Sequence, residues 1–419
     1  MKNFILRSNI VFVLLLIGLC MSSCSNTGNE TFNKQTLNIN SASVDTQTTE
    51  DFSSIETIYQ LNKPLISNED QTVSCERVMI PPEINGLRTS VIGVYNKDSL
   101  FLLLYEEIDS PILKAEFGLF DLNSQKYETL LPVRPNVSRA FRCNNDRYMI
   151  YISSEYLSSD YTSQVDELRA LEIDTKKDFL IHRYPDGYMS SSAKNSITLF
   201  NEKVYFDEIV YENDEIKDID TYEYDLQTNT LKKFRGSAQN PIVYKESIFT
   251  IVKNNADNAF QLESFEQDET IKLSRGINGV FSNNKTLFSI ENKFTDHKEK
   301  TTLSNLNNIT ANEELLTTTT AIDQIQGNDK FITWRNFTME KPILYLIDED
   351  QFLMLNDLPP SYNTYIIGDE ISVLICTNDN DIYTSEYYIL KQRSRNLFIQ
   401  LQNIYSVKDG RRSIFFQNK

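Results

Sequence analysis

Glycine and histidine are scarce in this chain. Its 419 residues include 12 glycines, two histidines and one tryptophan, whereas globular proteins use about 7% glycine. Turns therefore have to be made mostly by Asn and Asp, which accept the positive φ that tight turns need. Two histidines, His182 and His297, leave little material for a Ser-His-Asp triad, a Cys-His pair or a multi-histidine zinc site. We predict no catalytic residue, no metal ligand and no cofactor.

Recognisable phosphate-binding and hydrolase motifs are also missing. The chain has no P-loop, no GxGxxG and no GxSxG elbow. Basic residues are few compared with acids, 41 against 59, which gives a formal net charge of −18. A chain with this balance repels phosphate backbones, so nucleic acid is not an expected partner.

The longest apolar run lies at the N-terminus and is too short for a membrane span. Lys2 and Arg7 precede an apolar run over 10–21, whereas a spanning helix needs roughly 20 residues. A charged start, a short apolar middle and small residues at the end predict a secretory signal. The ending "MSSC", residues 21–24, resembles the bacterial lipobox, whose cysteine is lipidated and becomes the new N-terminus.

That resemblance implies a lipoprotein signal peptide over 1–23 and lipidation of Cys24; the alternative is an ordinary secretory signal with an incidental Cys24. Cleavage would leave 39 basic and 59 acidic residues, a net charge of −20. Ser25 in place of Asp implies the outer membrane in a Gram-negative cell; in a Gram-positive cell the protein would sit on the outer face of the cell membrane. Residues 24–54 hold few apolar side chains and are expected to form a flexible tether.

Three cysteines remain besides Cys24, namely Cys75, Cys143 and Cys376. An odd number cannot pair completely within one chain. Each lies in an apolar, strand-like run, and free cysteines are commonly buried. We therefore expect buried thiols in place of disulfides.

One short pattern recurs along the rest of the chain. In "TYEYDLQTNTLKKF", residues 221–234, apolar and acidic side chains alternate with strand periodicity, a polar turn follows, and a second run returns. Similar hairpins occur six more times. They lie at 117–131, 168–181, 261–273, 301–316, 343–355 and 387–401.

A second repeat, a short polar turn followed by an apolar strand, lies between these hairpins. It occurs eight times, at intervals of 39 to 56 residues. The first apolar residues after the turns are Leu100, Tyr148, Val204, Ile248, Leu287, Phe331, Ile371 and Ile414. Two hairpins per interval make four strands, which is the size of a β-propeller blade.

These repeats predict an all-β propeller over 55–417. Eight turn–strand copies favour eight four-stranded blades, with seven as the alternative. The last hairpin, near 403–416, would leave an open edge. We expect the N-terminal runs "SIETIYQL" (54–61) and "TVSCERVMI" (72–80) to complete the C-terminal blade and lock the ring. An irregular pair of β-sandwiches is the competing fold.

A lipobox, a tether and a repeat domain resemble the BamB-like outer-membrane lipoproteins and the wider group of quinoprotein-like and WD-like propellers. The Gly and Trp signature of the quinoprotein-like repeats is missing, since Trp334 is the only tryptophan. The resemblance therefore concerns architecture, implies a scaffold role, and transfers no binding residue.

Candidate ligand-contacting segments can be named, although the sequence identifies no ligand. Acidic loops at 346–352 and 378–386 could hold calcium or serve as solvated turns. Trp334 is expected to pack inside a blade, whereas 359–365 and 156–163 are expected to be exposed loops. The leading hypothesis is a lipid-anchored, extracytoplasmic propeller that binds another cell-envelope protein without catalysis. The alternatives are a surface glycan or peptide receptor, and a carboxylate-dependent enzyme acting on polysaccharide.

Overall fold

The computed structural model describes most of the chain between residues 56 and 392. The described residues are 37–39, 56–68, 73–106, 115–157, 163–184, 196–212, 215–253, 259–264, 266–267, 269–273, 277–295, 298–306, 312–318, 322–335, 342–356, 358, 362–368, 371–378 and 381–392. The signal peptide, Cys24, His297 and the hairpin near 403–416 lie outside them. Among the described residues no helix is long and apolar enough to cross a membrane.

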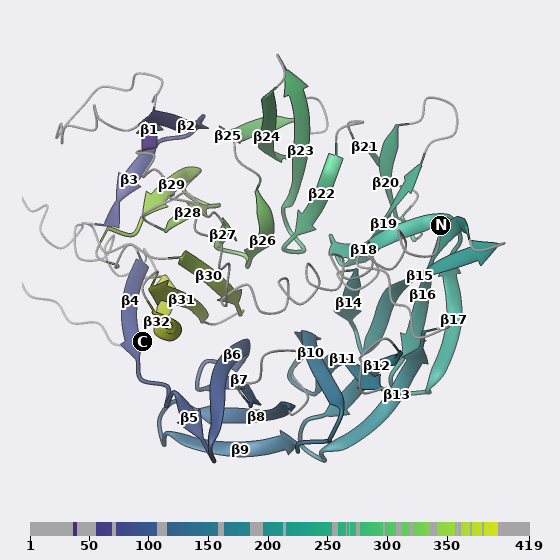
Figure 1. Cartoon of the computed structure of the whole chain (residues 1–419). Helices are drawn as coiled ribbons and strands as arrows, with labels where there is room; N and C mark the ends of the chain where they lie inside the picture. Colours follow the sequence, from purple (N-terminus) through teal and green to yellow (C-terminus); the bar gives the residue numbers. More distant parts are fainter. Residues whose placement is uncertain are drawn as a thin grey trace, which may run out of the picture.

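The chain forms a seven-bladed β-propeller (Figure 1). Seven antiparallel sheets stand around one axis, and each contributes four strands to a blade. Blades 1 to 4 consist of β6(Leu87–Asn96), β7(Ser99–Tyr105), β8(Ala115–Asp121) and β9(Lys126–Leu131); β10(Val137–Asn144), β11(Tyr148–Tyr156), β12(Gln164–Glu172) and β13(Lys177–Arg183); β14(Ile197–Phe200), β15(Lys203–Glu212), β16(Glu215–Asp225) and β17(Thr230–Arg235); and β18(Ala238–Tyr244), β19(Ser247–Lys253), β20(Phe260–Ser264) and β21(Thr270–Lys272).

Blades 5 to 7 follow the same plan, except that the last strand of blade 7 comes from the N-terminal part of the chain. They consist of β22(Ile277–Ser282), β23(Leu287–Thr295), β24(Lys298–Asn305) and β25(Glu313–Thr318); β26(Asp323–Gly327), β27(Phe331–Arg335), β28(Ile343–Leu346) and β29(Gln351–Met354); and β30(Tyr362–Ile367), β31(Ser372–Asn378), β32(Asp381–Gln392) and β4(Val73–Val78). The first strand of each blade lies nearest the axis (Figure 1).

The second strand of each blade carries the core. Seven of the eight predicted turn–strand copies form these second strands, and their first apolar residues are all at most 4% exposed. Side chains of adjacent blades pack together in the seams. Between blades 2 and 3, for example, Ile150 and Leu168 belong to the same buried cluster as Val204 and Phe206. The repeat pattern thus correctly located the core-forming strand of every blade.

The turns between first and second strands work largely through asparagine side chains. Asn145 Oδ1 accepts hydrogen bonds from the backbone amides of Arg147 and Tyr148. Asn283 and Asn328 close their own turns in the same way. This is the Asx turn, in which a side chain replaces a backbone acceptor. Among the described residues, 13 non-glycine residues have positive φ and seven of these are Asn or Asp, as the scarcity of glycine predicts.

The same turns also join neighbouring blades. The Tyr95 hydroxyl donates to the Asp146 carbonyl across the seam between blades 1 and 2 (2.9 Å). The Asn283 amide donates to the Asn328 carbonyl (2.7 Å), and the Asn328 amide donates to the Gly368 carbonyl (3.2 Å). We call this end of the ring the turn face. Because strands alternate in direction, the second-to-third and fourth-to-first connections share the opposite end, the loop face.

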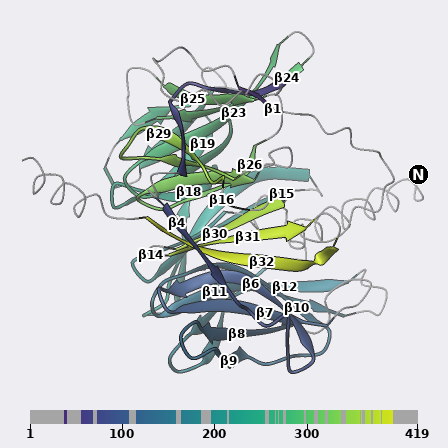
Figure 2. The same cartoon turned by 90° about the vertical axis from the view of Figure 1, so that its left-hand side faces the viewer.

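An N-terminal strap, residues 56–78, closes the ring. β2(Glu56–Leu61) pairs with β25 of blade 5, and β3(Leu65–Ser67) pairs in parallel with β29 of blade 6. β4 then pairs antiparallel with β32 and completes blade 7. In the side view of Figure 2, β4 lies on the near side of the ring. Two smaller strands, β1(Leu37–Ile39) and β5(Glu83–Ile84), pair with β2 and β6.

The expectation of eight blades is therefore wrong, and the seven-blade alternative holds. The run at 72–80, expected to complete an eighth blade with the hairpin near 403–416, takes the fourth-strand place beside β32 and completes blade 7. The run at 54–61 instead forms a fifth strand on blade 5. Within the segment expected to be a tether, Leu37–Ile39 form a strand. The seven described blades close the ring where β4 joins β32.

The outer strands differ in charge according to whether the strap covers them. β9, β13, β17 and β21 carry Lys or Arg, whereas β25 and β29, which the strap covers, carry neither. Lysine on an exposed edge opposes pairing with another chain. The charge pattern of the outer strands thus matches their exposure.

Lys63 fastens the strap between blades 5 and 6. Its ammonium pairs with Glu313 of β25 and with Asp350 of the β28–β29 turn (2.6 Å), and the Tyr345 hydroxyl donates to the same Asp350 (2.6 Å). Burial lowers the pKa of Lys63, but hydrogen bonds to Asp350 and Glu313 outweigh that effect and raise it overall. The Lys63 ammonium therefore links the strap to β25 and to the β28–β29 turn, which are distant from it in sequence.

We predict that Lys63→Met lowers the free energy of unfolding by about 1 kcal/mol, because two ion pairs to half-exposed carboxylates are lost while Met keeps the apolar part of the side chain. Urea denaturation followed by far-UV circular dichroism measures the change. The matched control is Lys391→Met, since Lys391 pairs with Glu76 in an exposed position and should lose less than about 0.5 kcal/mol. Equal losses in the two variants would contradict the role given to Lys63.

Candidate interaction site on the loop face

The loop face carries the long and variable connections of the ring. Connections between first and second strands have two to four residues. On the loop face, β7 and β8 are joined by 106–114, β11 and β12 by 157–163, and β13 and β14 by 184–196. Binding residues concentrate on such connections when a rigid scaffold positions them. The loop face is therefore the better candidate for recognition.

Large exposed apolar side chains also gather at this end. Met79 follows β4, Leu157 follows β11, and Tyr211 lies near the end of β15; they are 70%, 62% and 49% exposed. All three lie where strands reach the loop face. Leu180 and Leu231, on outer strands β13 and β17, are also exposed. Exposed apolar and aromatic side chains are suited to contacting a partner.

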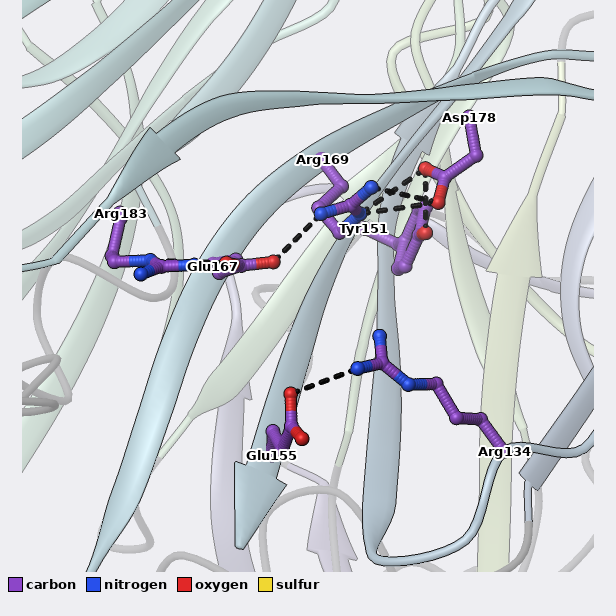
Figure 3. Close-up of polar contacts among 7 residues, drawn as sticks. All are labelled: Arg134, Tyr151, Glu155, Glu167, Arg169, Asp178 and Arg183. Atoms are coloured by element: carbon purple, nitrogen blue, oxygen red, sulfur yellow. Dashed lines mark hydrogen bonds and ion pairs between the residues drawn. The ribbon is translucent and has the colours of Figure 1, made fainter. Parts of the chain in front are cut away.

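A ladder of charged side chains crosses one face of blade 2 and ends at the loop face (Figure 3). The Tyr151 hydroxyl donates to Asp178 (2.8 Å), and the Arg169 guanidinium contacts Asp178 (2.9 Å) and Glu167 (2.7 Å). Arg183 then donates from Nε to Glu167 (3.0 Å). The ladder thus joins β11, β12 and β13 through alternating charges.

Electrostatics in the ladder favour the charged forms. Burial raises the pKa of Glu167, but hydrogen bonds from Arg183 and Arg169 outweigh burial and lower it overall. Burial lowers the pKa of Arg169, but Asp178 and Glu167 more than compensate and raise it. Burial and the neighbouring Asp178 raise the pKa of the Tyr151 phenol. Glu167 and Arg169 therefore stay ionised at neutral pH, and the Tyr151 phenol stays neutral.

Two exposed arginines mark the loop-face end of blade 2. Arg183 and Arg134 are 63% and 56% exposed, and Arg134 pairs with Glu155 (3.0 Å). Arg139, on the same face of the blade, donates to the carbonyls of Ala115 and Pro132 of blade 1 (both 2.8 Å). Arg139 thus fixes the seam, whereas the exposed guanidinium groups of Arg134 and Arg183 pair with Glu155 and Glu167 near the loop face.

The seam between blades 3 and 4 encloses a carboxyl group. Asp207 on β15 is 2% exposed. It accepts hydrogen bonds from the Thr221 hydroxyl (2.9 Å) and the Asn240 amide (2.7 Å), and Thr221 also contacts the Ala238 carbonyl (3.0 Å). Burial outweighs these hydrogen bonds and raises the pKa of Asp207 to about 7. The Asp207 carboxyl therefore joins two blades, because its partner Thr221 belongs to blade 3 and its partner Asn240 belongs to blade 4.

The candidates named from sequence are distributed over the ring and not assembled into one site. Trp334 is 4% exposed and packs against Phe352, as expected. In the loop 346–352, Asp350 is engaged by Lys63 and Tyr345. His182 lies within β13 and its side chain is mostly buried.

The expectation of thiols in place of disulfides is confirmed for Cys75, Cys143 and Cys376, none of which forms a disulfide. Cys376 is buried and the other two are partly buried. Burial raises the pKa of the Cys143 thiol to about 12, so it remains protonated. In the part of the chain that the structure describes, no three His, Cys, Asp or Glu residues are grouped as metal ligands.

Sequence reasoning missed the arginine ladder, although a signal was present. Glu167 and Arg169 are two residues apart, as side chains on one face of a strand must be. Asp178 and Arg183 lie on the returning strand of the same hairpin. Opposite charges on adjacent strands are a known cross-strand pairing, but their register depends on a bulge between Leu168 and Arg169 that no sequence pattern specified.

We predict that Arg169→Met lowers the free energy of unfolding by about 2 kcal/mol, because Glu167 and Asp178 lose the cation that separates them. Thermal unfolding followed by calorimetry measures the loss. Arg134→Met is the matched control and should cost less than about 0.5 kcal/mol, since its ion pair is exposed. A ladder that contributes nothing would give equal values for both variants.

We predict a pH-dependent stability that disappears in Asp207→Asn. A carboxyl with a raised folded-state pKa stabilises the fold while protonated; this contribution is complete below the unfolded-state pKa of about 3.9 and is lost as pH rises through the folded-state value. The wild type should therefore lose about 2–3 kcal/mol between about pH 5 and pH 8 relative to Asp207→Asn. Urea titrations across this range measure the difference.

The asparagine side chain introduced at position 207 can preserve the local hydrogen bonds: its oxygen can accept from Asn240, and its amide can donate to Thr221. Asp225→Asn serves as control, since hydrogen bonds from Thr228 lower the pKa of that exposed carboxyl and it stays ionised throughout the range. Parallel pH profiles of wild type and Asp207→Asn would contradict the prediction.

No protein-family model matches the chain, and no characterised protein matches it in sequence. Solved propellers resemble it in structure. The β-propeller domain of the Trilobed protease from Pyrococcus furiosus is 9% identical, with 75% of this chain and 98% of that chain covered and a TM-score of 0.49. An oligogalacturonate lyase from Vibrio parahaemolyticus is 10% identical, with 76% and 97% covered and a TM-score of 0.45. At these identities and TM-scores, the structural likenesses do not indicate a function.

Proposed function

We propose that this protein is a lipid-anchored, extracytoplasmic binding module that captures a cell-envelope protein through the loop face of its propeller. The observation that supports it is the position of exposed apolar side chains. Met79, Leu157 and Tyr211 lie at the loop-face ends of blades 7, 2 and 3. Aromatic and arginine side chains supply much of the energy at protein interfaces, and Arg134 and Arg183 lie at the same edge.

The anchoring part of the proposal comes from the sequence. It comprises lipidation of Cys24, the signal peptide over 1–23 and an architectural likeness to BamB-like lipoproteins. The strap suits such an arrangement, because the tether would join a segment held to blades 5, 6 and 7 by backbone pairing. A load on the anchor would then pass to three blades of the ring.

The alternatives receive less support from the described residues. An enzyme with carboxylates near the axis would require acids on the first strands of the blades. Those strands carry Arg88, Arg139 and Arg142 and a single acid, Asp323. Asp207, the described carboxyl with a raised pKa, lies on a second strand and is enclosed in a seam. A glycan receptor would require aromatic faces grouped in one groove, and the described exposed aromatics do not form such a group.

We predict that Leu157→Asp combined with Tyr211→Asp reduces capture of the partner at least about tenfold, since two apolar contacts would be replaced by charges. Crosslinking in cells followed by affinity purification, with quantitative mass spectrometry, measures capture. Leu180→Asp combined with Leu231→Asp is the matched control, because these leucines are exposed on outer strands. Control and loop-face variants should bind the membrane equally.

A Cys24→Ala variant tests the anchor separately. It should leave the membrane fraction and lose the partner in cells, while purified protein still binds the identified partner. Equal capture by the loop-face and control variants would overturn the proposed face. If neither the wild type nor the variants recovered a stoichiometric partner, the binding-module proposal would be overturned.

A further inference from the structure

The seam between blades 2 and 3 contains a histidine–glutamate pair near the loop face. His182 lies on β13 and Glu208 on β15, and His182 Nε2 is 3.4 Å from Glu208 Oε1. Their side chains are only 14% and 16% exposed. The two atoms are within ion-pair distance, but they form no hydrogen bond. A proton on His182 Nε2 would therefore complete a hydrogen bond to Glu208 Oε1.

Aromatic rings hold the imidazole in place. Its centroid is 5.0 Å from Tyr184, 5.2 Å from Phe206 and 6.4 Å from Tyr222. Phe206 and Tyr222 belong to blade 3, whereas His182 and Tyr184 belong to blade 2. Because rings from both blades surround it, His182 cannot turn away from Glu208 without opening the seam.

Three polar atoms at this seam are buried without a hydrogen-bond partner. They are His182 Nε2, Tyr184 Oη and Arg142 Nε. Tyr184 is 3% exposed, and Glu208, Arg142, Asp207 and Asp166 all act on its charge. A buried polar group without a partner costs the desolvation of that group. The polar end of this seam is therefore less stable than the apolar cluster beside it.

We propose that this seam is a proton-operated clasp on the binding face. When His182 is protonated, Nε2–H donates to Glu208 and an ion pair joins blades 2 and 3. When His182 is neutral, the pair is lost and the seam loosens. The consequence for recognition rests on the proposed function: Tyr211 lies three residues beyond Glu208 on β15, so a partner would meet a firmer surface at mildly acidic pH.

Other charged groups face the seam, and they define the controls. Asp166 accepts hydrogen bonds from Ser154 and Gln164, and Asp220 pairs with Lys233. Burial raises the pKa values of Tyr184 and Tyr222, so both phenols stay neutral. Asp207 lies on the opposite face of β15 and titrates separately. The groups to be considered are Arg142, Asp166, Tyr184, Asp207, Glu208, Asp220, Tyr222 and Lys233.

Hydrogen–deuterium exchange of the isolated protein tests the clasp without any partner. Peptides covering β13, β15 and β16 are compared at about pH 5.5 and pH 8, the range in which histidine changes charge. The exchange rate of each peptide is corrected for its intrinsic rate, and the peptides covering β27 and β28 of blade 6 serve as the reference. We expect roughly threefold or greater extra protection at the acidic pH in the wild type. His182→Gln and Glu208→Gln should each remove it.

Asp207→Asn is the control, because it removes the second titrating group of blade 3 and should retain the His182-dependent part. A second readout needs no destabilising change in the seam: in a His297→Gln background, proton NMR follows the remaining imidazole. Its titration midpoint should fall when Glu208 becomes Gln. Equal protection at both pH values, a pH effect that persists in His182→Gln, or an unchanged midpoint would each overturn the clasp. Since no partner is involved, these outcomes are independent of the proposed binding role.

Discussion

The ring depends on one backbone ladder between segments more than 300 residues apart. Val73 to Val78 of β4 pair residue by residue with Tyr387 to Gln392 of β32. Val73 and Leu390 are nearly completely buried and pack in the same cluster with Leu353 and Leu374. Without this ladder blade 7 would present an open edge, and the seams on both sides of it would lose their geometry. Strands β2 and β3 extend the same closure over blades 5 and 6.

The seams between blades divide into two zones. Toward the turn face they are apolar and are reinforced by hydrogen bonds between turns, as at Tyr95 and Asn283. Toward the loop face polar side chains enter, including Arg139, Asp207 and the His182–Glu208 pair. Apolar packing therefore holds one end of the seams, and titratable side chains lie toward the other.

The repeat unit could be predicted from the sequence, because alternating apolar residues and Asn-rich turns are local features. Leu100, Val204 and Phe331 lie where the turn–strand copies placed them. The blade number could not be read in this way, since it depends on which strand β4 joins. The same limit applies to the site: Arg169 and Asp178 meet through strand register, and His182 meets Glu208 across two blades. For contacts between separate elements, the sequence shows charges of suitable spacing but not the register that brings them together.

The lack of basic residues in β25 and β29 has a consequence for the solubility of the protein. A protease cut before β4 would remove β2 and β3 and leave β4 in blade 7. It would expose the edges of β25 and β29, whose backbone groups can pair with another chain and whose side chains include no Lys or Arg to oppose pairing. Protein cut in this way would be prone to self-association, so β2 and β3 also protect solubility.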